Sequence, residues 1–240
     1  MTNEEANEML REYLFKGIVS DIFWADEAYM MAKRIGDSAD QINSSGFGLL
    51  FRRLQEISSD RHTLSITKIF EARKRKYPIR SIPATLDLLE ENADLWTIPQ
   101  PQELHKILLK SGYTNAELNK FDNKQLTLEL VAHYRSEIPS LDRIDTCNLS
   151  LSLDTYFESR DKRVAHNEAV DESNRKQPTW GSGTSLLDYA KQFVGTISYG
   201  YLNVTLGQVG TQYYLTSDAS QVAHEIYRLL ETAGIITGEA

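Results

Sequence analysis

Apolar side chains recur at helical spacing along almost the whole chain, and this periodicity limits the fold more than any other feature. One such stretch covers residues 4–34 and another covers 184–206. Only 6 of the 240 residues are proline, so few positions forbid a helix. The pattern therefore predicts an all-α fold, a helical bundle in which each helix buries one apolar stripe.

Capping residues and breaks set the expected helix boundaries. Ser81 before Ile82-Pro83 predicts a helix start, since serine caps free N–H groups and proline fits the first turn. Asp122-x-x-Gln125 predicts another start, and Gly112 predicts a helix end. The expected helices cover 4–34 (with a break near Gly17), 40–57, 60 to the basic run before Pro78, 82–92, 102–111, 123–137, 140–148, 184–206 and 217–232.

The segments between these helices have patterns of their own. Leu149, Leu151 and Leu153 alternate with serines, which fits a short strand or an extended connector. Thr155-x-x-Glu158 predicts a capped helix start, and 179–183 predicts a loop. No linker is long enough to demand two domains. We therefore expect one helical domain over 1–240, with the proline-containing segment 93–122 as an insertion.

Composition narrows the cellular setting. No apolar run approaches the roughly 20 residues that span a bilayer, so we expect no membrane segment. The acidic start of the chain shows no secretory signal, and the single cysteine, Cys147, fits a reducing cytoplasm. The net charge of −8 argues against a broad electrostatic grip on nucleic acid. Two local basic clusters, in 73–80 and 160–176, fit either an anion site or a solvated surface.

The second basic cluster contains the pattern with most chemical meaning, Arg160-Asp161-Lys162-Arg163-Val164-Ala165-His166. An arginine fork can hold a phosphate, and an imidazole can move a proton at neutral pH. About one Arg-x(4–6)-His pair is expected by chance in such a chain, so context must decide its meaning. If one helix runs through the stretch, Arg160 and His166 stand about 9 Å apart along its axis. If a helix instead begins at Asp161, Arg160 stands at the N-terminus of that helix, where free N–H groups favour an anion. Asp161 then caps the helix or orients Arg160 by a salt bridge. The alternative is that Arg160 pairs with a glutamate and His166 caps a helix surface.

The sequence contains no recognisable motif for a metal site or a nucleotide-binding loop. There is no Cys-x-x-Cys and no His-Glu-x-x-His, because His224-Glu225 is followed by Ile-Tyr-Arg. No glycine loop has the spacing and lysine of a nucleotide site. We therefore expect no metal and no cofactor, which leaves acid/base chemistry by histidine supported by arginine.

The stretch 160–166, placed before a long apolar helix in an all-helical chain, resembles the signature of the HEPN (higher eukaryotes and prokaryotes nucleotide-binding) domain. That signature is an arginine, a polar residue, a short spacer and a histidine. Other segments resemble the abortive-infection U-type (AbiU-like) branch of this superfamily. They are Phe23-Trp24 with Tyr29, the helix 51–57, Asp60-Arg61-His62 with the residues after it, and Arg80-Ser-Ile-Pro-Ala-Thr-Leu. The similarity extends over about residues 10–230.

The resemblance implies a HEPN-like helical bundle with additional helices that acts as a metal-independent endoribonuclease. By this resemblance His166 is the general acid/base, Arg160 stabilises the phosphate and Asp161 is the accessory polar residue. It also implies RNA as the substrate, a homodimer in which two motifs face one cleft, and a role as a toxin or antiviral effector restrained by a partner antitoxin, of the nucleotidyltransferase or another type.

Four further residues are weaker candidates for binding the substrate. Lys162 and Arg163 lie within the motif, and Arg61 and His62 could face it from another helix. Helix-surface or buried-pair roles are the alternative for Arg61 and His62. The alternative for the whole chain is a non-catalytic HEPN-like module that binds a nucleotide or a protein, or a helical scaffold with an accidental motif.

Overall fold

The computed structural model describes residues 1–73, 79–140, 149–165, 178–209, 212–214 and 218–237. Within these residues the chain is a bundle of helices, and its one sheet is a two-stranded antiparallel hairpin. The elements are α1 (Asn3–Arg11), η1 (Glu12–Ile18), α2 (Val19–Asp37), α3 (Ala39–Ser44), α4 (Gly48–Ile69), α5 (Ile82–Glu91), α6 (Pro101–Lys110), α7 (Asn115–Leu118), α8 (Asn123–Ser140), α9 (Leu149–Ser159), η2 (Arg160–Ala165), α10 (Trp180–Leu202), β1 (Gly207–Val209), β2 (Gln212–Tyr214) and α11 (Ala219–Thr232). The all-α prediction is confirmed.

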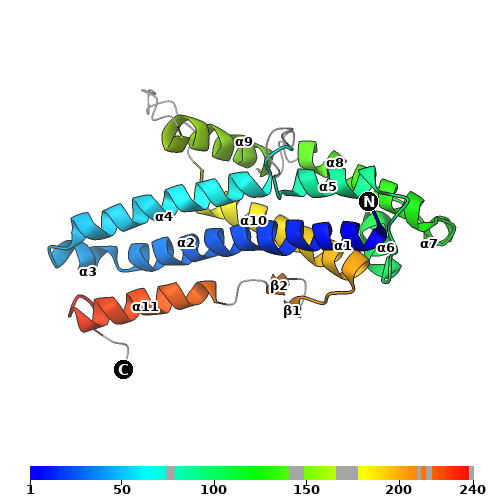
Figure 1. The fold of residues 1–240 in the computed structure, drawn as a ribbon. Coiled ribbons are helices and arrows are strands. Elements are labelled where there is room, and N and C mark those ends of the chain that lie inside the picture. The colour runs from blue at the N-terminus through cyan, green and yellow to red at the C-terminus, as the bar shows by residue number, and fades with distance from the viewer. Residues whose placement is uncertain (74–78, 141–148, 166–177, 210–211, 215–217, 238–240) are drawn as a thin grey trace.

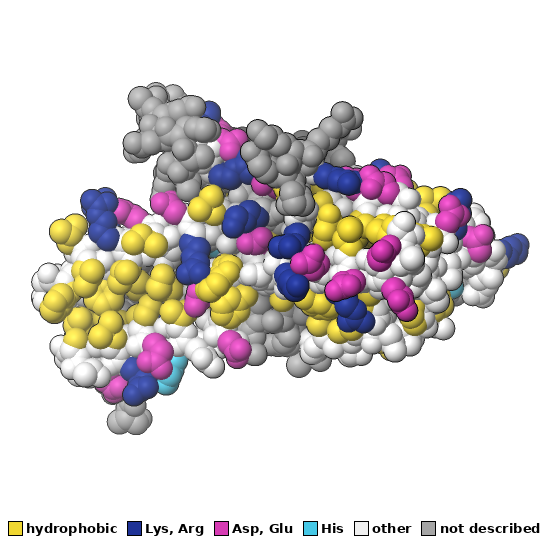
Figure 2. Space-filling view, viewed as in Figure 1, with side chains coloured by type: hydrophobic (Ala, Val, Ile, Leu, Met, Phe, Trp, Pro, Cys, Tyr) yellow, Lys and Arg dark blue, Asp and Glu magenta, His cyan; other side chains and the backbone are white. Residues whose placement is uncertain are grey.

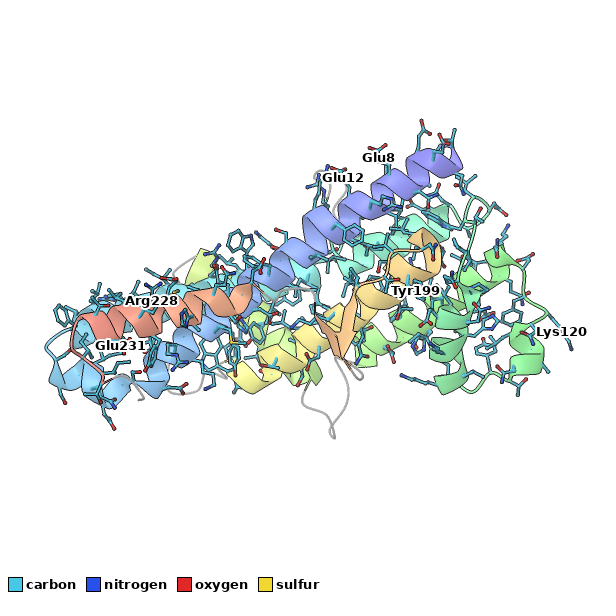
Figure 3. All side chains as sticks on the ribbon, turned by 90° about the horizontal axis from the view of Figure 1, so that it is seen from below. Glu8, Glu12, Lys120, Tyr199, Arg228 and Glu231 are labelled. Atoms are coloured by element: carbon cyan, nitrogen blue, oxygen red, sulfur yellow. The ribbon has the colours of Figure 1, made fainter. Side chains whose placement is uncertain are left out.

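A long rod formed by α1, η1 and α2 runs through the bundle (Figure 1). The helix α4 returns along α2, and α11 lies on another side of α2. The helices α9 and α10 pack against α4, while α5 and α8 pack against each other near the end of α4. Figure 3 shows α11, with Arg228, at one end of the molecule, and Lys120 at the opposite end.

Two separate apolar clusters hold these elements. The main core joins α1, η1 and α2 to α5, α8, α9 and α10, and it includes Leu14, Ile22, Leu86 and Phe193. The small core lies between the far ends of α2 and α4, and it consists of Ile35, Ile42, Phe51, Ile226 and Leu230. The last two residues belong to α11, so this helix is attached through the small core.

Three local signals for helix ends predicted the observed boundaries. The Ser81 hydroxyl accepts a hydrogen bond from the Ala84 N–H at 3.3 Å, and Asp122 Oδ1 accepts one from the Gln125 N–H at 2.7 Å. Gly112 follows α6 with a φ of +97°, a conformation that suits glycine. These three predictions are confirmed because each depends on neighbours in sequence.

Several predicted boundaries were wrong. The helix expected over 40–57 is divided between α3 and α4, and α4 continues through polar Ser58 and Ser59 into the helix expected from 60. That helix ends at Ile69, before the basic run in which its end was expected. Leu149–Ser159 is a helix rather than a strand or connector, and Thr155 is buried inside it instead of capping it. The expected loop 179–183 belongs largely to α10, whose first turn Thr179 caps.

Other predictions differ less from the structure or lie outside the residues that it describes. The rod does not break at Gly17 but widens into the π-helix η1. Pro139 does not interrupt α8, which ends at Ser140. The predicted helix 140–148 lies almost wholly outside the described residues. The segment 93–122 contains α6 and α7, and its description as an insertion in a single domain stays a prediction. No described helix is long and apolar enough to cross a membrane.

Candidate functional site

Arg160 begins η2, the π-helix that directly continues α9. Of the two arrangements considered from the sequence, the described residues show the continuous one, with no helix starting at Asp161. A π-helix has i→i+5 hydrogen bonds and is rare, and such turns occur frequently at functional sites. His166 follows Ala165, the last residue of η2, and lies outside the described residues.

The Arg160 side chain is held on three sides. Its Nε donates a hydrogen bond to Asp161 Oδ1 at 2.7 Å, and its Nη1 lies 3.8 Å from Glu71 Oε2. Its guanidinium lies over the Phe157 ring, 4.9 Å from the centroid. Only 21% of the side chain is exposed, so the cation is partly shielded from water. Asp161 thus pairs with Arg160 although no helix begins at Asp161, and the Glu71 contact is the glutamate pair that the non-catalytic alternative expected.

Arg160 forms part of the wall of a pocket of about 650 Å³. Apolar side chains from four elements line most of the interior: Phe70, Pro83, Leu86, Ile138, Leu153 and Phe157. Arg73, Arg135 and Arg160 line it as well, together with Glu71, Asp87 and Asp154. A pocket of this size with an apolar interior and a few polar groups is typical of a small-ligand site.

Ion pairs fix the other two arginines of the pocket. Arg135 Nη2 lies 2.8 Å from Asp87 Oδ1 and 2.7 Å from Glu90 Oε2. Arg73 Nη1 lies 2.5 Å from Glu91 Oε1 and 3.9 Å from Asp87 Oδ2. The three carboxylates, Asp87, Glu90 and Glu91, all belong to α5, so this helix positions both arginines. The guanidiniums are kept in place, but much of their charge is neutralised.

The remaining motif residues have different surroundings. Lys162 Nζ lies 2.6 Å from Glu158 Oε1, an i,i+4 pair on an exposed helix surface. The backbone of Arg163 belongs to η2, and its side chain lies outside the described residues. The structure therefore brings together Arg160 and Asp161, and it places Lys162 on the surface beside them.

Arg61 and His62 do not join this pocket. Arg61 lies over the Trp24 ring at 3.8 Å, with its Nη1 3.4 Å from Glu27 Oε2, so it belongs to the α2–α4 surface. His62 is buried, with 2% of its surface exposed, and its Nδ1 is 3.0 Å from the Ala25 carbonyl oxygen. These positions support the structural alternative for both residues.

Aromatic side chains enclose His62. Its ring centroid lies 4.9 Å from that of Trp180 and 5.9 Å from that of Tyr156. Its Nε2 is buried and has no hydrogen-bond partner among the described residues. Burial lowers the pKa of this histidine, since a charged imidazolium would lose its hydration. His62 is therefore a core residue whose burial favours the neutral imidazole.

Sequence reasoning missed Arg135, Asp154 and Phe157. Arg73 belonged to a recognised basic cluster, but the others are isolated on long helices and carry no local motif. Only the packing of α8 and α9 around the end of α4 brings them together (Figure 1). Among the described residues, no group of three or more His, Cys, Asp or Glu side chains is placed to hold a metal ion.

A helical bundle with an arginine held at the start of an Arg-polar-…-His stretch fits the HEPN-type domain that the sequence resembles. A family model described as AbiU2 matches residues 12–221. The chain belongs to this AbiU2 family of HEPN domains, and it is a module of the abortive-infection type. The match begins at the first residue of η1 and ends near the start of α11, so α1 and most of α11 lie beyond it. Comparisons with curated proteins and with solved structures gave no significant match.

Proposed function

We propose that this chain is a metal-independent endoribonuclease that acts as a defence or toxin effector. The observation that carries the proposal is the position of Arg160, which is partly shielded in a pocket wall and oriented by Asp161. A guanidinium held in this way needs little rearrangement to stabilise a phosphate as charge develops on it. The resemblance to the HEPN signature adds His166, six residues further on in the sequence.

The proposed reaction uses the ribose 2′-hydroxyl as the nucleophile. A bond forms between the 2′-oxygen and phosphorus, and the bond from phosphorus to the 5′-oxygen breaks. The products are a 2′,3′-cyclic phosphate and a 5′-hydroxyl end. One proton leaves the 2′-hydroxyl and one reaches the leaving 5′-oxygen. His166 carries out one of these two transfers and water the other, while Arg160 stabilises the negative charge on the phosphate.

The test compares the wild-type chain with His166→Ala and Arg160→Ala on tRNA and mRNA in the presence of EDTA. We expect cleavage that survives chelation and is lost in both variants. Arg228→Ala is the matched control, because Arg228 lies on α11 at the far end of the bundle (Figure 3). Full cleavage by His166→Ala would exclude this mechanism. Growth arrest on expression, relieved by the same two substitutions, is the cellular version.

We also propose that the enzyme is a homodimer in which two motifs share one cleft. On the face seen in Figure 2, lysines and arginines lie among aspartates and glutamates rather than in a broad basic surface. Two adjoining copies would concentrate positive charge in a protein of net charge −8. Light scattering at micromolar concentration is expected to give twice the chain mass. A monomer would contradict the shared cleft.

A partner antitoxin is the last part of the proposal, and we place it on the exposed apolar side chains of α4 and of Phe47, the residue before its first turn. Phe47, Leu50 and Ile57 are 50%, 55% and 60% exposed, and apolar surface of this kind often marks a protein interface. Ile57 lies more than three helical turns before the end of α4, away from the pocket. The product of the neighbouring gene is expected to co-purify with the wild type but not with Leu50→Lys/Ile57→Lys. Equal capture by this variant would exclude the site.

One observation favours a second candidate, a non-catalytic module that binds a nucleotide or a protein. The three pocket arginines all have carboxylate neighbours, which weakens their attraction for RNA. This candidate predicts nucleotide or protein binding without cleavage, and Arg160→Ala would then weaken binding alone.

A further inference from the structure

The pocket beside Arg160 has more features than phosphate binding requires. Its interior is mainly apolar, and the Phe157 ring forms part of it directly beneath the Arg160 guanidinium. A phosphate on Arg160 therefore has a half-buried aromatic ring next to it. Nucleobases stack on aromatic side chains in single-stranded RNA complexes, and one sugar separates a base from its phosphate.

Asp154 gives this pocket an acceptor. It lies one helical turn before Phe157 on α9 and lines the same pocket. Among the described residues it makes no ion pair, whereas Asp87 is shared by Arg73 and Arg135. Its carboxylate is thus available to accept hydrogen bonds from a ligand. A carboxylate accepts from the exocyclic amino group of a base, and uracil has no such group.

We propose that this pocket binds a nucleobase, and that Asp154 makes it prefer adenine, guanine or cytosine to uracil. The base packs against the part of the Phe157 ring that lines the pocket and that Arg160 leaves uncovered, its amino group donates to Asp154, and its own phosphate lies on Arg160. The volume of about 650 Å³ accommodates one nucleotide, within the usual range of small-ligand sites. Binding of a nucleobase in this pocket does not depend on the proposed ribonuclease activity. Only the further step, that the phosphate bound by Arg160 is the one that is cleaved, rests on the proposed function.

Titration calorimetry with nucleoside 5′-monophosphates tests this pocket without any cleavage, because these probes contain no phosphodiester. The full-length wild-type chain is expected to bind AMP, GMP and CMP more tightly than UMP, by about 5- to 10-fold for one hydrogen bond. Inorganic phosphate serves as the probe for Arg160 alone and is expected to bind more weakly than any nucleotide. Equal affinity for phosphate and all four nucleotides would overturn the proposal.

Three variants assign the binding to named side chains. Phe157→Leu keeps an apolar group but removes the ring face, and it is expected to weaken all nucleotides about 5-fold or more. Asp154→Asn is expected to remove the discrimination against UMP while keeping the stacking. Phe121→Ala is the control, since Phe121 is half-buried against Tyr113 outside the pocket. Melting temperatures measured alongside identify any variant that has lost its fold.

The two proposals fail in different ways. Nucleotide binding that depends on Phe157 and Asp154, in a chain that does not cut RNA, would keep the pocket and exclude the ribonuclease. RNA cleavage that depends on Arg160, with nucleotide affinity unchanged in Phe157→Leu and Asp154→Asn, would keep the ribonuclease and exclude the base site.

Discussion

The chain has two arginine–histidine pairs, and the described members of these pairs, Arg61, His62 and Arg160, have different surroundings. Arg61 and His62 are adjacent on α4, where the histidine is buried among aromatic rings and the arginine covers Trp24 on the surface. Arg160 stands at the start of η2 in the wall of a pocket, and His166 follows that helix. The first pair stabilises the bundle, and the second is the pair that we propose to act on RNA.

The difference shows that the packing partners decide what such a pair does. His62 faces inward because Ala25, Tyr156 and Trp180 form its surroundings on three different helices. Arg160 is instead left at an opening where α9 passes the end of α4. Substitutions at the first pair should therefore change stability, and substitutions at the second should change activity.

The largest expected effect is on activity at Arg160. Arg160→Lys keeps the positive charge but loses the planar fork and its stacking on Phe157. We expect RNA cleavage to fall by about 100-fold or more, as for removal of a transition-state donor, with a change in melting temperature of only a few degrees. Cleavage at the wild-type rate would remove the contrast between the two pairs.

A pair of glycines tests the packing around His62. A Cβ on Gly183 would collide with His62 Nε2 and the Tyr156 hydroxyl, which are both held in the core, whereas one on Gly181 would meet nothing within 4 Å. Gly183→Ala is expected to cost about 1–3 kcal/mol of unfolding free energy. Gly181→Ala, in the same helical turn, should be neutral or stabilising by up to about 1 kcal/mol. Equal denaturation midpoints for Gly183→Ala and Gly181→Ala would show that the packing around His62 has room for an added methyl group.

The pH dependence of stability is the next effect in size. Because burial lowers the pKa of His62, the unfolded chain binds a proton there more readily than the folded chain. His62 makes its full contribution to the free energy of unfolding above its unfolded pKa of about 6.5. This contribution is lost as the pH falls, and the free energy of unfolding then changes by at most about 1.4 kcal/mol per pH unit. His62→Asn retains a donor for the Ala25 carbonyl and should remove this slope in urea titrations.

Asp21 acts in the opposite direction in the same titrations. Burial raises the pKa of its carboxyl to about 6, despite Lys68 Nζ at 3.8 Å. The folded chain therefore binds this proton more tightly, and stability falls as the pH rises from about 4 to 6. The His62→Asn comparison is best made in an Asp21→Asn background, where only the His62 slope should remain.

The smallest effect is expected at Arg61. Its ion pair with Glu27 and its contact with Trp24 are both at the surface, where each is worth less than about 1 kcal/mol. Arg61→Ala should lower stability slightly and leave the rate of RNA cleavage unchanged. A selective loss of cleavage would mean that Arg61 contacts the substrate after all.

The sequence was sufficient for features that depend on near neighbours. Helix starts at Ser81 and Asp122 depend on residues three positions away, and the Arg160–Asp161 contact joins adjacent residues. The alternation of leucine and serine at 149–153 misled because so short an apolar pattern fits a strand as well as a helix, and the packing of α9 against α4 and α10 is not visible in the sequence. Asp154 and Phe157 could not be assigned to a site, since their partners on α4, α5 and α8 are distant in sequence.

The small core under α11 has a consequence for how the molecule opens. It shares no buried residue with the main core, and α11 provides two of its five members. Regions that are held by few contacts exchange their amide hydrogens through partial opening rather than global unfolding. We therefore expect the amide hydrogens of α11 to exchange with deuterium well before those of α10. The helix α11 can then detach from the end of the bundle while the helices around Arg160 stay folded.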